Sequence, residues 1–124
     1  MAKIIGLGGV FFRSRDPAGL ARWYAEHLGL AVEESFGGAM FNEDAARPGY
    51  TLWSPFKETT DYFGDRAQGF MINFRVDELD PLLAHLRAIG TVVDDKVDDS
   101  EYGRFGWFID PDGNRVELWQ PPAG

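Results

Sequence analysis

The sequence contains no cysteine among its 124 residues. This absence excludes a disulfide scaffold, a thiolate metal site and a cysteine nucleophile. The chain also lacks an apolar run of the ~20 residues that a membrane-spanning helix requires. The amino-terminal stretch has neither the basic region nor the small-residue cleavage site of a signal peptide. These absences predict a cytoplasmic protein that does not span a membrane.

Basic residues are also scarce, with 12 lysines and arginines against 20 aspartates and glutamates and a formal net charge of -8. Nucleic acids and anionic membrane surfaces are bound through basic patches, so neither is an expected partner. Aromatic residues, by contrast, make up 15% of the chain and include 4 tryptophans. This is more than the core of such a small chain needs, and it indicates a surface that faces a small-molecule ligand.

Two blocks of similar pattern, residues 16–29 and 77–90, each follow an apolar run that is typical of a strand. Each block contains an Asp-Pro pair, beginning at Asp16 and at Asp80, which places a capping side chain before a proline at the first helical position. Each block ends on a glycine, which suits the left-handed stop of a helix. The leucines and aromatic residues between them recur at helical spacing. We therefore expect one helix in each half of the chain.

The remaining apolar runs predict short strands. In the first half they cover residues 4–13, 30–36, 39–42 and 50–54, and in the second half residues 69–76, 92–97, 105–110 and 115–120. Each half then consists of a strand, a helix and three strands. We expect an α+β fold in a single domain, made of a module at residues 3–54, a linker at 55–68 and a module at 69–120.

Alternate residues of a strand point to opposite faces of a sheet. One face of strand 69–76 is wholly apolar and is expected under a helix, and the opposite faces of the strands gather aromatic groups with few polar ones. The predicted ligand-binding residues on this second face are Phe11, Thr51, Trp53, Met71, Asn73, Glu117 and Trp119. Such a surface is typical of a pocket, although a solvent-facing sheet and a dimer interface are the alternatives. Trp107 is expected in the core, and Tyr62 and Tyr102 lie in loops from which a tyrosine can close over a pocket.

The repeated module, the segment WYAEHLGL and the ending FGWFIDPDGNRVELWQP resemble the vicinal oxygen chelate superfamily of glyoxalases, bleomycin-resistance proteins and extradiol dioxygenases. The resemblance covers nearly the whole chain. It implies two βαβββ modules that form a curved mixed sheet around a cavity, the glyoxalase/bleomycin resistance fold. It also implies a homodimer.

The superfamily's metal-ligand positions map to Gly9, Thr51, Met71 and Glu117 in this sequence. Among these, Glu117 alone carries a side chain suited to a hard divalent cation, and such a site needs three or four nitrogen or oxygen donors. The histidines His27 and His85 fall on the expected helices and do not complete the set. We therefore expect no metal ion and no other cofactor.

These observations favour a metal-free binding protein of the bleomycin-resistance type, with an aromatic or cationic ligand in a cleft. Glu117 is then an anchor for the ligand and the candidate catalytic base, or else a relic carboxylate that is solvated or paired with Arg75 or Arg115. The alternative is an enzyme, either a glyoxalase-like lyase or isomerase or an extradiol-type dioxygenase, with a divalent metal near Glu117. A regulatory or structural dimer module is the third hypothesis.

Overall fold

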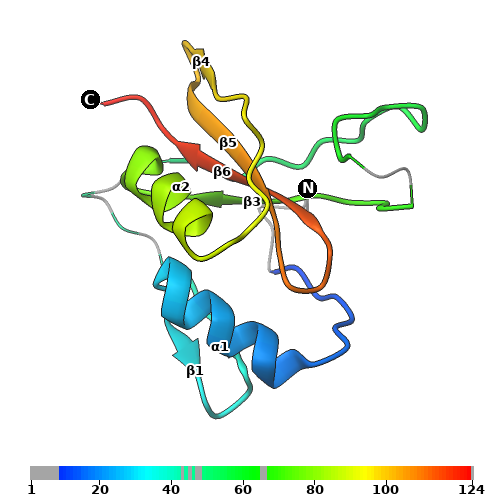
Figure 1. Ribbon diagram of the computed structural model, residues 1–124, viewed down its shortest axis with the longest axis vertical. Coiled ribbons are helices and arrows are strands. Elements are labelled where there is room, and N and C mark those ends of the chain that lie inside the picture. Colours follow the sequence, from blue (N-terminus) through cyan, green and yellow to red (C-terminus); the bar gives the residue numbers. More distant parts are fainter. Residues whose placement is uncertain (1–8, 43, 45, 47–48, 65–66, 124) are drawn as a thin grey trace, which may run out of the picture.

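The computed structural model describes residues 9–42, 44, 46, 49–64 and 67–123 (Figure 1). The elements are α1 (Pro17–Leu28), β1 (Val32–Glu33), β2 (Gly38–Ala39), β3 (Ile72–Arg75), α2 (Leu79–Ala88), β4 (Asp98–Ser100), β5 (Gly103–Ile109) and β6 (Arg115–Gln120). In this part of the chain, neither helix has the length and apolar character needed to cross a membrane. The expected α+β class is confirmed, with one helix in each half of the chain.

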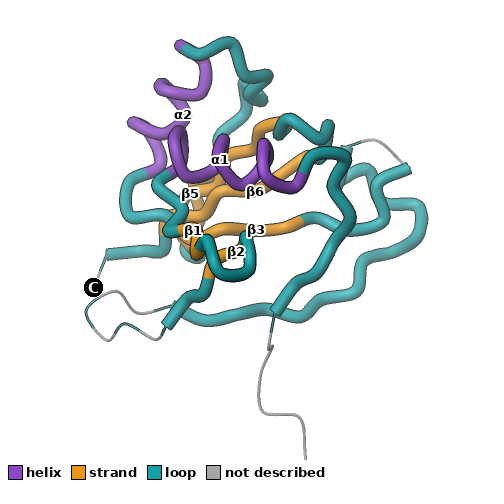
Figure 2. Tube along the Cα trace, turned by 90° about the horizontal axis from the view of Figure 1, so that it is seen from below, coloured by secondary structure: helices purple, strands orange, loops and turns teal. Residues whose placement is uncertain are grey.

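The second half of the chain forms a four-stranded sheet in the order β3-β6-β5-β4. Strand β3 runs parallel to β6, whereas β5 is antiparallel to both β6 and β4. Figure 1 shows β6 between β3 and β5, and Figure 2 shows both helices on one side of the sheet. This half is a strand, a helix and three strands, as its sequence pattern predicts.

The first half departs from the four strands expected of it. Among the described residues it contains α1 and a two-stranded hairpin of β1 and β2. The expected strand at 50–54 and the described part of the one at 4–13 are not strands, while residues 4–8 lie outside the described part of the chain. A strand forms only where its backbone groups pair with a neighbour, and these segments have no strand partner within the described chain. In the second half, residues 92–97 make a single bridge, Val93 to Phe108, and the regular strand begins at Asp98.

The two helices begin in different ways. Asp16 caps α1 as expected, because its carboxylate accepts a hydrogen bond from the backbone N–H of Gly19 at 3.1 Å. The expected cap by Asp80 is wrong, since α2 begins at Leu79, whose N–H donates to Oε1 of Gln120 at 2.8 Å. A side chain from β6 thus satisfies a helix end that the local sequence leaves open. Asp80 instead pairs with Arg104 at 3.0 Å.

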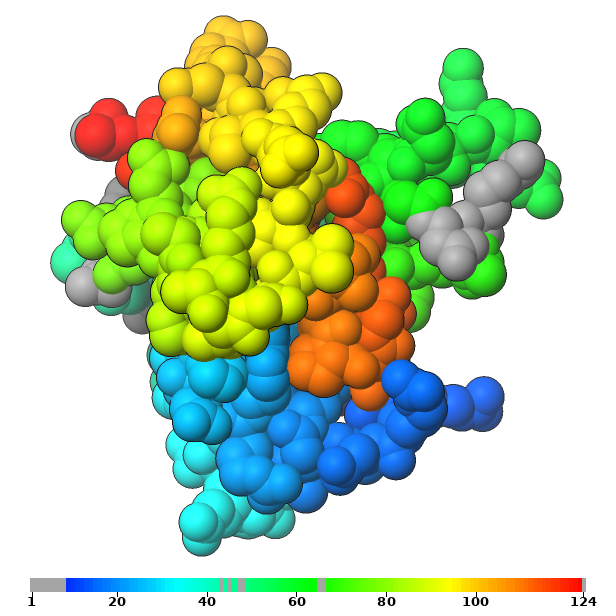
Figure 3. All heavy atoms as spheres, viewed as in Figure 1, coloured from blue at the N-terminus to red at the C-terminus, as the bar shows by residue number. Residues whose placement is uncertain are grey.

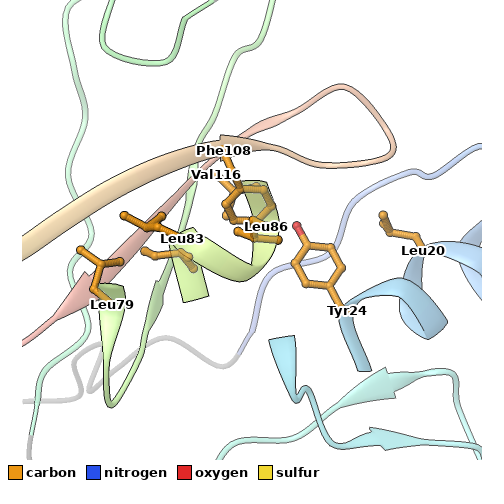
Figure 4. Close-up of a cluster of buried hydrophobic side chains, with 8 residues drawn as sticks. Leu20, Tyr24, Leu79, Leu83, Leu86, Phe108 and Val116 are labelled. Atoms are coloured by element: carbon orange, nitrogen blue, oxygen red, sulfur yellow. The ribbon is translucent and has the colours of Figure 1, made fainter. Parts of the chain in front are cut away.

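The hydrophobic core lies between the helices and one face of the sheet (Figure 4). Its buried members are Leu20, Tyr24, Leu79, Leu83, Leu86, Phe108, Val116 and Leu118. A side-chain carbon at Gly106 would lie 2.9 Å from Leu83, so glycine at this position lets α2 approach β5 closely. Tyr24 joins α1 to the turn after β5, since its hydroxyl donates to Asp110 at 3.0 Å. The opposite face of the sheet is left for other contacts.

Candidate functional site

Glu117 lies at the centre of the face of the sheet that points away from the helices. It stands on β6 with Val116 and Leu118 directed into the core on the other side. Its register partners are Asn73 on β3 and Trp107 on β5. Residues directly opposite each other on neighbouring strands share a face, so the pairing brings these three side chains together.

The Glu117 carboxylate is almost fully buried, at 6% exposure. The Nδ2 of Asn73 donates to its Oε1 at 2.6 Å, and the indole Nε1 of Trp107 donates to its Oε2 at 2.8 Å. A buried carboxylate is tolerated where such donors replace its lost contacts with water. The strands therefore supply part of the polar environment that keeps Glu117 inside the protein.

Tyr62 provides a further donor, and it comes from the expected linker. Its hydroxyl donates to Oε2 of Glu117. Its ring is stacked on Phe56, with centroids 5.5 Å apart and planes at 16°, and meets the ring of Trp107 edge-on at 6.0 Å. Burial raises the pKa of Tyr62 above its ordinary value, and the hydrogen bond to Glu117 and the charge of that carboxylate raise it further. The Tyr62 hydroxyl is therefore held in its protonated, donating form.

The segment that carries Tyr62 is attached to β6 through Arg115 and Gln68. The Oε1 of Gln68 accepts a hydrogen bond from the backbone N–H of Arg115 at 2.7 Å, and its Nε2 donates to the Arg115 carbonyl at 2.9 Å. The Nε of Arg115 donates to the carbonyl of Tyr62 at 3.1 Å. The same guanidinium lies 5.3 Å from the centroid of the Trp107 ring and pairs with Asp94 at 3.1 Å. The backbone at Tyr62 is thus anchored beside Glu117.

Aromatic rings continue along this face of the sheet from Glu117. Trp119, two residues further along β6, is buried and stacks on Phe105 with centroids 6.0 Å apart and planes at 9°. The ring of Tyr50 lies 5.0 Å away on another side of Trp119. The indole Nε1 of Trp119 donates to the carbonyl of Tyr102 at 2.7 Å. The second face is therefore aromatic around one buried carboxylate.

The structure brings some of the predicted site residues together and leaves others apart. Asn73 and Glu117 are hydrogen-bonded, and Trp119 shares their face of the sheet. Met71 is half-buried just before β3. The other three, Phe11, Thr51 and Trp53, lie on exposed segments of the first half, with Phe11 96% and Trp53 82% exposed. The hydrogen bonds to Glu117 involve none of these three, and their role in binding stays a prediction.

Sequence reasoning did not identify Trp107 and Tyr62 as partners of Glu117. Trp107 is buried as expected, but it faces Glu117 instead of the helices. The alternation in residues 105–110 is the signal that could have shown this, because it places Phe108 on the core face and Trp107 on the other. Tyr62 was expected in a loop from which a tyrosine can close over a pocket, but no local signal identifies Glu117 as its partner, which it reaches only through the fold. Arg115, considered as an ion-pair partner of Glu117, pairs with Asp94.

The segment before β3 contains two hollows. One of about 390 Å³ is lined by residues 54–57, 59 and 60, and one of about 220 Å³ is lined by Phe56, Lys57, Glu58, Thr60, Phe63, Gln68 and Gly69. Figure 3 shows this segment, in green, projecting from one side of the molecule. The hollows adjoin Phe56, on which the Tyr62 ring is stacked. Phe56 is thus the link between these hollows and the surroundings of Glu117, since neither Tyr62 nor Glu117 lines either hollow.

The residues present do not fit the divalent metal that the resemblance implies. At the mapped positions, Gly9 has no side chain and Met71 offers a thioether, a poor ligand for zinc, nickel or iron. Within the described ranges, no group of three His, Cys, Asp or Glu side chains is placed to hold a metal ion. The nearest ring nitrogens of His27 and His85 are 3.3 Å apart, where α1 meets α2. Both oxygens of Glu117 already receive hydrogen bonds, so a metal ion would have to displace these donors.

Comparisons with known proteins agree with this architecture. Residues 9–119 match the model of the glyoxalase-like domain family. A protein of unknown function from Agrobacterium tumefaciens has a similar structure, with a TM-score of 0.55 and 21% identity over 94% of this chain and 98% of that chain. The antibiotic-binding protein TnmS3 from a Streptomyces species has a TM-score of 0.52 and 24% identity, covering 88% of this chain and 89% of that chain.

A third similar structure, from Sphaerobacter thermophilus, is a member of the glyoxalase/bleomycin resistance protein/dioxygenase superfamily. It has a TM-score of 0.50 and 18% identity, covering 97% of this chain and 98% of that chain. No curated protein sequence gives a significant match. With its two helices, its open mixed sheet and a family match over most of its length, the chain belongs to the glyoxalase-like domain family of the vicinal oxygen chelate superfamily.

Proposed function

We propose that this protein binds a small aromatic or cationic molecule on the Glu117 face of the sheet without a divalent metal, as a binding protein of the bleomycin-resistance type. The observation that carries the proposal is the buried Glu117 carboxylate, which lies among aromatic rings and, within the described chain, belongs to no group of three His, Cys, Asp or Glu side chains that could hold a metal ion. Ligand sites are largely apolar with a few polar groups that orient the ligand. Glu117 is such a group, and its carboxylate accepts hydrogen bonds from a bound molecule.

One of the similar structures supports a binding role. TnmS3, which shares this fold, is an antibiotic-binding protein. The same fold serves several functions, and function depends on the site. A glyoxalase-like or dioxygenase reaction uses a metal to stabilise an enolate or to activate oxygen. The donor set around Glu117 does not supply the ligands for such an ion, so binding is the function that its chemistry favours.

The binding proposal predicts that ligands stabilise the protein in the presence of a chelator. A thermal-shift screen of antibiotics, thiol conjugates and aromatic metabolites, run in EDTA, should give compounds that raise the melting temperature. Glu117→Gln should weaken the binding of such a compound by about tenfold to a hundredfold, because a hydrogen bond to a charged group contributes about 1.5–3 kcal/mol. Trp53→Ala should also weaken it, if Trp53 lines the site as predicted from the sequence.

The matched control for Glu117→Gln is Glu101→Gln, which changes an exposed glutamate in the turn between β4 and β5. It should leave the affinity unchanged. Metal analysis of protein purified without chelator tests the alternative, a metal-dependent enzyme. One zinc, nickel or iron ion per chain, removed by Glu117→Gln, would overturn the metal-free proposal in favour of the enzyme.

A second copy of this chain is the proposed protein partner. The first half exposes large apolar side chains, which in this proposal form the apolar patch of the interface: Val10, Phe11, Phe12, Phe36, Met40, Phe41, Leu52 and Trp53. Large exposed apolar surface is typical of an interaction site in a folded protein. Its segments include those expected to form strands, which lack strand partners within the described chain. Pairing with a second copy buries the apolar side chains and gives the backbone of these segments a strand partner. Most oligomers of identical chains are symmetric dimers.

The dimer is tested by sedimentation at micromolar concentration. The wild-type protein should sediment as a dimer, and Leu52→Asp should convert it to a monomer because it places a charge in the apolar patch, where Leu52 is 71% exposed. Val92→Asp is the control, since Val92 is 69% exposed in the second half, outside the patch. A monomeric wild type, or equal effects of the two variants, would contradict the proposal.

A further inference from the structure

The three donors to Glu117 differ in how they are held. Asn73 and Trp107 stand on strands that pair with β6 on either side. Tyr62 stands in a segment outside the sheet, with its backbone anchored through Arg115. Trp107 is almost fully buried, Asn73 on β3 is exposed, and Tyr62 is half-buried. Tyr62 differs from the other two in donating a hydroxyl from a stacked aromatic ring, so it is the donor that another aromatic molecule can imitate and replace.

The Tyr62 side chain fills a slot with defined walls. Its ring is stacked on Phe56, meets the edge of Trp107 and directs its hydroxyl to Oε2 of Glu117. The hollow of about 220 Å³ shares Phe56 with this slot. A flat ring in the place of the Tyr62 ring meets the same aromatic surfaces, those of Phe56 and Trp107.

Charges around the slot limit the groups that fit it. The guanidinium of Arg115 lies 5.3 Å from the Trp107 centroid, so a cationic group in the slot has a positive charge beside it. The carboxylate of Glu117 in turn repels an anion. A neutral hydroxyl on an aromatic ring meets neither penalty, and it donates the hydrogen bond that Glu117 accepts from Tyr62.

We propose that Tyr62 occupies the place of the ligand, and that the ligand carries a neutral aryl hydroxyl that replaces the Tyr62 hydroxyl on Glu117. This inference rests on the proposed function, because it names the chemical class of the ligand at the same site. It narrows the choice between aromatic and cationic ligands to phenols and related hydroxyaromatic compounds. In the free protein, Tyr62 keeps the slot closed and satisfies Oε2 of Glu117.

Removal of the Tyr62 side chain tests the proposal with two probes, p-cresol and toluene, which have the same methyl-substituted ring and differ by one hydroxyl. Calorimetric titration of Tyr62→Ala should show at least about tenfold tighter binding of p-cresol than of toluene, which lacks the hydroxyl. Wild-type protein should bind p-cresol at least about tenfold more weakly than the variant, because Tyr62 competes for the slot. Adding Glu117→Gln to Tyr62→Ala should reduce the preference for p-cresol over toluene.

The matched control is Tyr102→Ala, since Tyr102 is also a loop tyrosine and its ring is exposed. This variant should gain no affinity for p-cresol over the wild type. If circular dichroism shows that Tyr62→Ala is unfolded, Tyr62→Phe takes its place, and p-cresol should bind it severalfold more tightly than the wild type. Equal binding of p-cresol and toluene by folded Tyr62→Ala would overturn the proposal, as would equal p-cresol affinity of Tyr62→Phe and wild type.

The binding function and the Tyr62 inference are contradicted by different results. A compound from the chelator screen whose affinity depends on Glu117 but not on Tyr62 leaves the binding function in place and overturns this inference. Conversely, a slot that binds p-cresol in Tyr62→Ala, in a protein for which the screen finds no compound, supports the slot and contradicts the binding function.

Discussion

Replacement of Glu117 by alanine should lower the free energy of unfolding by about 1–3 kcal/mol, because the buried indole N–H of Trp107 loses its acceptor and an orphaned buried donor costs about that much. Trp107 is the clearest case, since its indole N–H lies in a side chain that is almost fully buried. Asn73 and Tyr62 lose the same acceptor. Urea unfolding followed by tryptophan fluorescence measures the change.

Two further variants show whether the loss of stability comes from the missing hydrogen-bond acceptor at residue 117. One keeps an acceptor at this position, and the other removes an exposed carboxylate elsewhere in the chain. Glu117→Gln keeps an acceptor oxygen for Trp107 and Tyr62, and the amide of Asn73 can turn so that its oxygen faces the new NH₂ group. We therefore expect Glu117→Gln to lose little stability. Glu101→Ala removes an exposed carboxylate and should change the free energy of unfolding by less than about 0.5 kcal/mol. A stability of Glu117→Ala close to that of Glu101→Ala would show that the hydrogen bonds to Glu117 contribute little to folding.

The second large effect is a loss of stability at alkaline pH, caused by two buried tyrosines. Burial raises the pKa of Tyr24 above its ordinary value of 10.0, and the charge of Asp110 and the hydrogen bond to it raise it further. The pKa of Tyr62 is raised by burial and by Glu117. In the folded protein both hydroxyls keep their protons at a pH where the unfolded chain releases them. The stabilisation is therefore fully present below about pH 10 and is lost as the pH rises above it.

The measured quantity is the slope of the free energy of unfolding against pH. Tyr24 alone should contribute a fall of about 1.4 kcal/mol in the free energy of unfolding for each pH unit above about pH 10. Tyr62 should contribute less, because it is only partly buried and solvent screens its charge. Urea unfolding between about pH 9 and about pH 12 should give a shallower fall for Tyr24→Phe and for Tyr62→Phe than for wild type.

Tyr102→Phe is the control for the alkaline series, because Tyr102 is exposed and should leave the slope unchanged. All other ionisable groups are common to the variants, so their contributions cancel in the differences. If Tyr24→Phe falls as steeply as the wild type, the Tyr24 hydroxyl ionises as readily in the folded protein as in the unfolded chain, and its burial has no energetic effect.

Local sequence rules predicted the helices well. The cap at Asp16 and the left-handed glycine at residue 29 both act within a few residues of α1, and both are observed. The predicted start of α2 was wrong by two residues, because the group that satisfies it, Gln120, lies far away in the sequence. A helix end depends on local residues only where those residues supply its hydrogen bonds.

The strands of the first half were predicted less well for the same physical reason. An apolar run defines the faces that a strand would have, but a strand exists only when another strand pairs with it. In the second half α2 and the turn after β5 bring the strands together, so β3, β5 and β6 form. In the first half, the segments around Phe11 and Trp53 are exposed and unpaired by strands in the described chain.

The alternation of residues along β3 and β6 was enough to place Glu117 and Asn73 on the face opposite the core, because it requires no knowledge of distant residues. The groups that donate to the Glu117 carboxylate depend on how the whole chain packs. Trp107 arrives through the register of β5 against β6, and Tyr62 through a long connection that folds back over the sheet. Register and loop closure depend on the packing of the whole chain, and so the carboxylate could be found from the pattern of residues while its hydrogen-bond donors could not.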